Sequence, residues 1–188
     1  MLQIKRAKDS RVIKCILHRG FDVPGGVTVK TSELGGTALL EGTPIGYDTD
    51  TMWHVTKTAT VVTEAAADAV TYQVAKGSHF KVGDVFATEG ANGKAITGID
   101  KTTYADKDVF TLATTLGAII PVGTVGFQST GANKVVKYPP TAIVGSNEDI
   151  DGSNLFVPAL LQAVIRTGNA PAVNATLTGT LKGVIYIV

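Results

Sequence analysis

The chain has 188 residues, of which 44% are hydrophobic and 18% charged, and its formal net charge is +1. This size suits one domain, or a domain with a smaller one inserted, and the composition is that of a globular protein rather than a disordered one. A charge this close to zero gives no field that would attract nucleic acid. The single cysteine excludes an internal disulfide framework and a cysteine-rich zinc site.

The first twenty residues are basic and lack the apolar run of a signal peptide. Their only acid is Asp9, and their cationic residues are Lys5, Arg6, Lys8, Arg11, Lys14 and Arg19. One interpretation is a solvated edge strand, whose charges discourage unwanted pairing. The other is an arm that docks on an acidic partner surface. We expect no membrane contact, since no apolar run approaches the roughly 20 residues that span a bilayer.

Most of the chain has a β-strand pattern. Threonine and valine are its two most frequent residues, both β-branched, and the 21 glycines separate short alternating runs. The predicted strands lie within residues 26–31, 54–62, 71–77, 81–88, 94–100, 108–115, 134–138 and 182–188. The sequence therefore predicts a mainly β protein, a small barrel or sandwich.

One short helix is predicted near the C-terminus, over roughly Leu155 to Arg166. Ser153 or Asn154 would cap its start, Pro158 would occupy its first turn and Gly168 or Asn169 would end it. The alanine-rich segment 63–70 is flanked by β-branched runs, so we expect a loop or a single turn there.

A short sequence pattern that occurs twice, which we call the internal echo, suggests how the chain is divided into domains. The pattern V-G-[DT]-V occurs at residues 82–85 and 122–125, and in each copy a glycine can take the positive φ of a tight turn before valine returns to a strand. We expect residues 60–128 to form an inserted β module. Residues 1–60 and 129–188 would then pair into the main β core, with the basic segment as its N-terminal arm.

The residue types that could act as catalysts or metal ligands occur in patterns that indicate structural roles. His18, His54 and His79 show no metal-binding spacing, and Cys15 alternates with apolar residues as a buried, inert thiol does. We therefore expect no metal, no cofactor and no catalytic residue. A hydrolase of unknown mechanism is the least favoured reading, because no nucleophile elbow or metal motif appears.

The segment 147–152 is similar to the start of a calcium loop, because Asn147, Asp149 and Asp151 alternate and Gly152 follows them. The twelfth position of such a loop needs a bidentate glutamate, and here it is Pro158. Turn and cap chemistry is the favoured interpretation.

The middle of the chain resembles phage head fibre and head decoration proteins over roughly residues 60 to 130. In those proteins a hairpin of the form V-x-KGH-x-F-x-VGD-V precedes AIT-x-ID and D-V-x-T-x-x-TTLG strands. The matching residues are Tyr72, Val74, Lys76, Gly77, Phe80 to Val85, Ala95 to Asp100, Tyr104, Asp108, Val109, Thr114 to Ala118 and Gly123 to Val125. The family's usual histidine-glycine after Lys76-Gly77 is here Ser78-His79.

This resemblance implies a non-enzymatic virion structural protein, made in the bacterial host cytoplasm and attached to the capsid surface. It further implies contact with the major capsid protein and assembly as a homotrimer. The conspicuous turn residues Lys76, Gly77, Phe80, Gly83 and Asp84 then form a structural hairpin. Lys5, Arg6, Lys8 and Arg11 become candidate capsid-attachment residues.

The apolar C-terminal run needs cover, so we expect it to be buried in a sheet or a subunit interface. Its residues are Val184, Ile185, Tyr186, Ile187 and Val188. The alternative function is a carbohydrate or cell-surface binding module, with glycan contact through Trp53, Tyr47 and Tyr72, since such sites display exposed aromatic rings.

Overall fold

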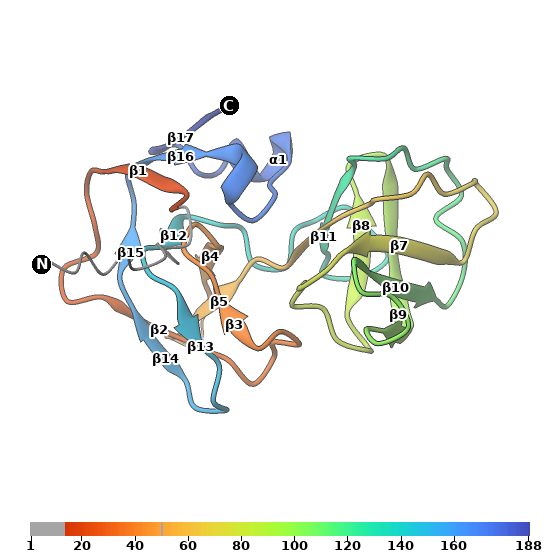
Figure 1. Ribbon diagram of the computed structural model, residues 1–188, viewed down its shortest axis with the longest axis horizontal. Coiled ribbons are helices and arrows are strands. Elements are labelled where there is room, and N and C mark those ends of the chain that lie inside the picture. The colour runs from red at the N-terminus through yellow and green to blue at the C-terminus, as the bar shows by residue number, and fades with distance from the viewer. Residues whose placement is uncertain (1–13, 50) are drawn as a thin grey trace, which may run out of the picture.

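The computed structural model describes residues 14–49 and 51–188 and is almost entirely β-structure (Figure 1). It confirms the predicted mainly β fold, with one six-stranded sheet that nearly closes into a barrel and a second that curls into a half-barrel. Figure 1 shows these sheets in two lobes, which two chain segments connect.

The near-closed sheet contains consecutive strands of the chain. Its order is β6 (Thr58–Thr60), β11 (Val125–Gln128), β8 (Val85–Thr88), β9 (Ala91–Asp100), β10 (Lys107–Leu112) and β7 (Thr71–Ala75). We call residues 58–128 the inserted unit. The predicted module border at residue 60 falls on the last residue of β6, and the division into two domains stays a prediction.

The rest of the described chain forms what we call the terminal unit, residues 14–57 and 129–188. Its curled sheet has the order β14 (Leu155–Val157), β2 (Val27–Val29), β5 (Trp53–Val55), β4 (Pro44–Tyr47), β12 (Ala142–Val144) and β15 (Ala159–Leu160). A three-stranded sheet contains β1 (Ile16–Arg19), β16 (Ala163–Arg166) and β17 (Val184–Ile187), and a small pair joins β13 (Glu148–Asp149) to β3 (Ala38–Leu39).

Each unit has its own apolar core, as alternation along the strands requires. In the inserted unit Phe80, Phe86 and Phe110 pack edge to face, with ring centroids 5.4 to 5.6 Å apart. In the terminal unit one core lies between the faces of the curled sheet, and another lies under the three-stranded sheet.

The predicted position of the helix is wrong. Residues 155–166 form β14, β15 and β16. Burial alternates along β16, where Ala163 and Ile165 are buried, whereas both residues of β15, Ala159 and Leu160, are buried. β-branched residues and Pro158 suit this extended path better than a helix. The short helix is α1 (Ala175–Thr178), and a turn of 3₁₀ helix, η1 (Thr167–Asn169), precedes it.

The start of α1 is set by Asn174, whose side-chain oxygen accepts a hydrogen bond from the backbone N–H of Leu177 at 3.0 Å. Leu177 is the buried residue of the helix, and it packs with Ala87 and Phe127 of the inserted unit. The alanine-rich segment 63–70 is a turn, as expected, closed by the N–H of Ala69 donating to the carbonyl of Ala66.

Candidate functional site

The stretch from Thr71 to Phe86 connects β7 to β8, which are not neighbours in the sheet. The expectation of a two-stranded hairpin is therefore wrong, because β9 and β10 separate the two strands. Its turns are nevertheless well defined: Gly77 has a φ of 86° and Gly83 a φ of 95°. Phe80 lies between these turns with no exposed surface, so it anchors the connection in the aromatic core.

Both glycines of the internal echo take the predicted positive φ, 95° at Gly83 and 86° at Gly123. In each copy the valine two residues later begins a strand, β8 at Val85 and β11 at Val125. These two strands are antiparallel neighbours. The repeat in the sequence therefore builds equivalent turns at the ends of adjacent strands.

Asp84, beside the first of these turns, is the centre of a polar cluster. Its Oδ2 accepts from the backbone N–H of Lys81 at 2.8 Å and from the ammonium of Lys57 at 2.6 Å. Its Oδ1 accepts from the side-chain amide of Gln128 at 2.8 Å. Both carboxylate oxygens thus have partners within the chain, as a largely buried carboxylate requires.

Lys57 lies on the segment that leads from the terminal unit into the inserted unit, between β5 and β6, and only 1% of its surface is exposed. Its ammonium also donates to the backbone carbonyl of Glu33 at 2.7 Å. Burial lowers the pKa of Lys57, and the carboxylate of Asp84 partly opposes this effect. The ion pair therefore joins a terminal-unit loop to a turn of the inserted unit.

A second group of polar side chains extends this cluster into the terminal unit. The hydroxyl of Tyr138 donates to Oε2 of Glu33 at 3.1 Å, and Nδ1 of His54 lies 3.4 Å from the same oxygen. The rings of His54 and Tyr138 are stacked, with centroids 4.1 Å apart. Burial alone would raise the pKa of Glu33, but the Tyr138 hydroxyl and nearby positive charge outweigh it and lower that pKa.

The sequence pointed to Asp84 but not to its partners. Glu33, Gln128 and Tyr138 have no short-range motif in common, and only the folded chain brings them near Lys57. The one available signal was Lys57 itself, a lone charge in a run of β-branched residues. We call Lys57, Asp84, Gln128, Glu33, His54 and Tyr138 the junction cluster. Its hydrogen bonds and ion pairs connect side chains of the two units, so the cluster positions the units relative to each other.

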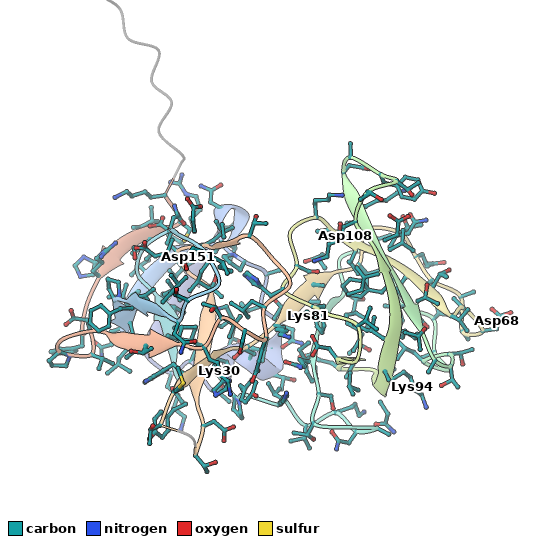
Figure 2. All side chains as sticks on the ribbon, turned by 90° about the horizontal axis from the view of Figure 1, so that it is seen from below. Lys30, Asp68, Lys81, Lys94, Asp108 and Asp151 are labelled. Carbon is teal, nitrogen blue, oxygen red and sulfur yellow. The ribbon has the colours of Figure 1, made fainter. Side chains whose placement is uncertain are left out.

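Lys76 has a related role on another side of the inserted unit. Its ammonium donates to the carbonyls of Lys101 and Tyr104 and lies 3.3 Å from Oδ1 of Asp108. Asp108 is buried on β10, within the inserted unit as Figure 2 shows. Lys76 therefore holds the loop between β9 and β10 closed.

The remaining titratable candidates are placed separately. His18 is exposed on β1, and His79 is partly buried, where desolvation lowers its pKa to about 4. Cys15 is buried, as expected for an inert thiol, and desolvation followed by the charge of Glu41 raises its pKa to about 11. At that pKa the thiolate is not populated near neutral pH.

In the acidic segment after β12, the polar side chains accept hydrogen bonds from backbone N–H groups of loops and turns. The side-chain oxygen of Asn147 accepts from the backbone N–H of Glu41 at 2.7 Å, and that of Asp151 accepts from the N–H of Ser153 at 2.9 Å. Asp149 lies within β13. Within residues 14–49 and 51–188 no cluster of three or more His, Cys, Asp or Glu side chains is arranged for a metal ion.

The C-terminal run forms β17, which pairs in parallel with β16 at the edge of the three-stranded sheet. Val184 is buried, whereas Ile185 is 60% exposed and Ile187 41% exposed. The strand therefore covers the core with one face and presents apolar side chains with the other. Lys5, Arg6, Lys8 and Arg11 lie outside the described residues.

The three aromatic candidates for glycan contact divide into two groups. Tyr72 has no exposed surface, and its hydroxyl donates to the carbonyl of Ala69, so it cannot contact a glycan. Tyr47 is 54% exposed, and its ring lies 6.0 Å from that of Trp53 across the β4–β5 pair. Of the three candidates, Tyr47 and Trp53 therefore remain available for glycan contact.

No protein-family model, curated protein or solved structure matches this chain. The helices within residues 14–49 and 51–188 are too short to cross a lipid bilayer. The resemblance to phage head proteins stays a prediction, and the function must be argued from the residues.

Proposed function

We propose that this chain is a non-enzymatic structural protein of a phage virion, of the head fibre or head decoration type. It attaches to the outside of the capsid by contact with the major capsid protein and assembles as a homotrimer. Support comes from the sequence resemblance over residues 60 to 130, in which the turn and strand residues Lys76, Gly77, Phe80, Gly83 and Asp84 match the family pattern.

The structural observation that carries the proposal is the outer surface of β17. This strand lies at the edge of its sheet, and the described chain supplies a neighbour on one side only, β16. Its exposed face presents Ile185 and Ile187, beside Val164 and Arg166 of β16 in the parallel register. An apolar edge strand of this kind is a surface for pairing with another chain.

The mass of the protein in solution tests the assembly. Light scattering on a size-exclusion column, at several concentrations, should give a species near three times the 19.5 kDa chain mass. The trimer should then bind empty phage heads. A monomer at every concentration that also fails to bind heads contradicts the proposal.

Capsid attachment is tested by removing Met1 to Lys8, which deletes three of the candidate attachment residues. The shortened protein should fold and assemble as before, because the three main apolar cores are built from residues 15 onward. Binding to heads should be lost. Unimpaired attachment would overturn the role given to Lys5, Arg6 and Lys8.

A carbohydrate or cell-surface binding role is the second candidate, and the Tyr47–Trp53 pair is the observation that favours it. The exposed ring of Tyr47 is available for stacking on a sugar face. A glycan array should then give hits that Tyr47→Ala abolishes. An array without hits removes this candidate.

A further inference from the structure

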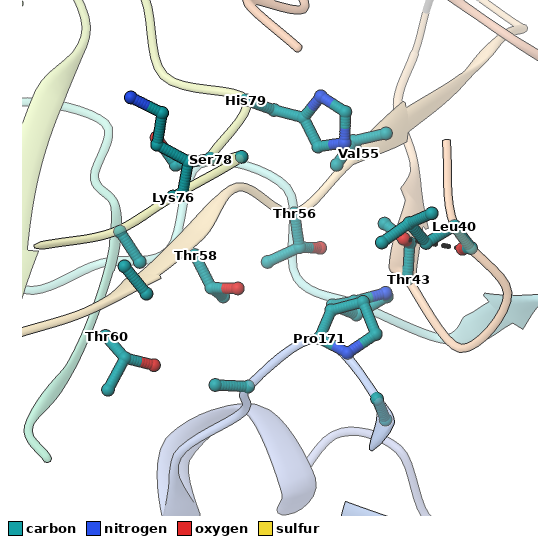
Figure 3. Close-up of a pocket in the computed structure, with 16 residues that line it drawn as sticks. Leu40, Thr43, Val55, Thr56, Thr58, Thr60, Lys76, Ser78, His79 and Pro171 are labelled. Atoms are coloured by element: carbon teal, nitrogen blue, oxygen red, sulfur yellow. Dashed lines mark hydrogen bonds between the residues drawn. The ribbon is translucent and has the colours of Figure 1, made fainter. Parts of the chain in front are cut away.

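A cavity of about 260 Å³ lies where the two units meet (Figure 3). Thr58 and Thr60 of β6 form one wall, and Ser78 and His79, which follow β7, form the next. Pro171, on the segment before α1, lies opposite β6. Residues of the segment 40–44 complete the lining, so four distant parts of the chain surround this space.

The cavity exists because β6 and β7 diverge. The two strands are bridged at Val61 and Val74, where the N–H of Val62 donates to the carbonyl of Gln73 at 2.9 Å. On the other side of that bridge the lining comes from residues 58–60 and 75–79, with no ladder between them. The bridge closes one end of the cavity, which makes it a pocket rather than a continuous groove for an extended peptide.

Hydroxyl groups line this pocket. Thr58 and Thr60 are two residues apart on a strand, so they share one face, and Figure 3 shows both hydroxyls turned toward the space in front of Pro171. Ser78 also lines the pocket, but its hydroxyl oxygen is fully buried, so a ligand in the pocket does not reach it. A threonine hydroxyl both donates and accepts hydrogen bonds, so Thr58 and Thr60 can pair with a polar ligand in this space.

The pocket carries no free charge. The ammonium of Lys76 is held by the carbonyls of Lys101 and Tyr104, and Figure 3 shows its side chain running away from the cavity. His79 is neutral near pH 7, because desolvation lowers its pKa to about 4. A charged ligand would therefore lose its hydration without gaining a counter-charge.

The remaining lining is apolar, with Pro44, Val55 and Pro171 as its larger members. Hydroxyls that donate and accept, set among C–H surfaces, match the two kinds of surface on a sugar ring: hydroxyl edges and C–H faces. We propose that this pocket binds one neutral monosaccharide unit, either as a free sugar or as the terminal unit of a glycan. Neither Tyr47 nor Trp53 lines it, so this site is separate from the aromatic surface of the carbohydrate-binding candidate.

The test is a titration of the full-length, ¹⁵N-labelled protein with D-glucose, D-galactose, D-mannose and N-acetylglucosamine, followed by ¹H–¹⁵N correlation spectra. At least one sugar should shift the amides of Thr58, Ser78 and Ala172 as a cluster. Methyl glycosides of that sugar form the second arm. Their binding assigns the pocket to a terminal glycan unit, and their failure assigns it to the free sugar.

Variants give the test its specificity. Thr60→Val removes one of the two hydroxyls that face the pocket and keeps the side-chain shape, so the fold should be kept while the Kd rises about fivefold. Ala172→Phe fills the pocket and should abolish the shifts, whereas Thr28→Val, on the exposed face of β2, should leave the Kd unchanged. Tyr47→Ala should also leave it unchanged, which separates this pocket from the aromatic surface.

Three results would overturn the proposal. The first is the absence of shifts with all four sugars up to tens of millimolar, which would leave the pocket to water. The second is shifts that persist in the Ala172→Phe protein. The third is a stronger response of the same amides to inorganic phosphate or to trialanine, since a charged or peptide ligand contradicts a neutral sugar site.

Discussion

Asp84 accepts hydrogen bonds from three parts of the chain that are far apart in sequence. The donors are the ammonium of Lys57, the backbone N–H of Lys81 and the amide of Gln128. Removing one member of a buried ion pair leaves the other charge without compensation, which costs more than the pair itself contributes. Replacing one charged residue of the junction cluster should therefore destabilise the fold more than replacing both members of the ion pair together.

Asp84→Asn should lower the free energy of unfolding by about 3–5 kcal/mol, because the buried ammonium of Lys57 loses its counter-charge. The double variant Lys57→Met, Asp84→Leu should be less destabilised than the sum of its single changes, by at least about 1 kcal/mol. Urea unfolding at pH 7 measures both effects. Asp68→Asn, on an exposed loop at the far end of the inserted unit (Figure 2), is the control and should change little. Additive single changes would show that the pair is not coupled.

His79 gives the fold a dependence on pH. Burial first, and then the charges of Lys57 and Lys101, lower its pKa from 6.5 to about 4. Between these two values the unfolded chain binds a proton that the folded chain does not, so stability falls as the pH falls. The loss at pH 4 relative to pH 7 is about 3 kcal/mol.

The variant His79→Phe should remove this part of the pH dependence, because phenylalanine is similar in size and cannot titrate. Thermal unfolding of the variant and the parent between pH 7 and pH 4 measures the difference. His18→Gln, at an exposed position on β1, provides the control. If the stability of His79→Phe and that of the parent depend on pH in the same way, then the pKa of His79 is not lowered by folding.

At the scale of elements, the sequence predicted what depends on local geometry. The positive φ of Gly83 and Gly123 was predicted from the V-G-[DT]-V pattern, since glycine takes this conformation without steric cost and the second valine can begin a strand. The helix was misplaced because the apolar run of residues 155–166 fits either period, and burial of alternate residues appears only when β14 and β16 find their partners. Helix α1 is too short to show a helical period.

The two echo glycines allow a test of backbone conformation alone. An added Cβ at Gly83 or Gly123 would meet no atom within 4 Å, so steric clash with neighbours does not contribute. Alanine at either position should still cost about 1–2 kcal/mol, the price of a left-handed conformation. Gly90 is equally open but lacks the positive φ, so Gly90→Ala is the matched control and should be close to neutral. Equal stabilities for the three variants would contradict this account.

At the scale of the whole molecule, the two units are joined by more than their connecting segments. Lys81, which lies between the lobes in Figure 2, donates to the carbonyl of Ser32 at 3.0 Å, and Lys101 donates to that of Gly35 at 2.8 Å. On another side Glu89 accepts from the N–H of Thr176 at the start of α1. Polar contacts therefore fix the units to each other, and no local sequence pattern could have predicted these partners.

The assembly role that we propose for β17 can be separated from its role in folding, because its two faces differ. Val184 lies on the buried face, so Val184→Lys should destabilise the fold by at least about 2 kcal/mol. Ile187 is 41% exposed, so Ile187→Asp should leave the melting temperature nearly unchanged and still convert a trimer into monomers. Val122→Asp places the same charge at an exposed valine of the inserted unit and should affect neither quantity. Light scattering and thermal unfolding of the three variants decide the matter: a folded Ile187→Asp protein that keeps the mass of the parent trimer would remove β17 from the subunit interface.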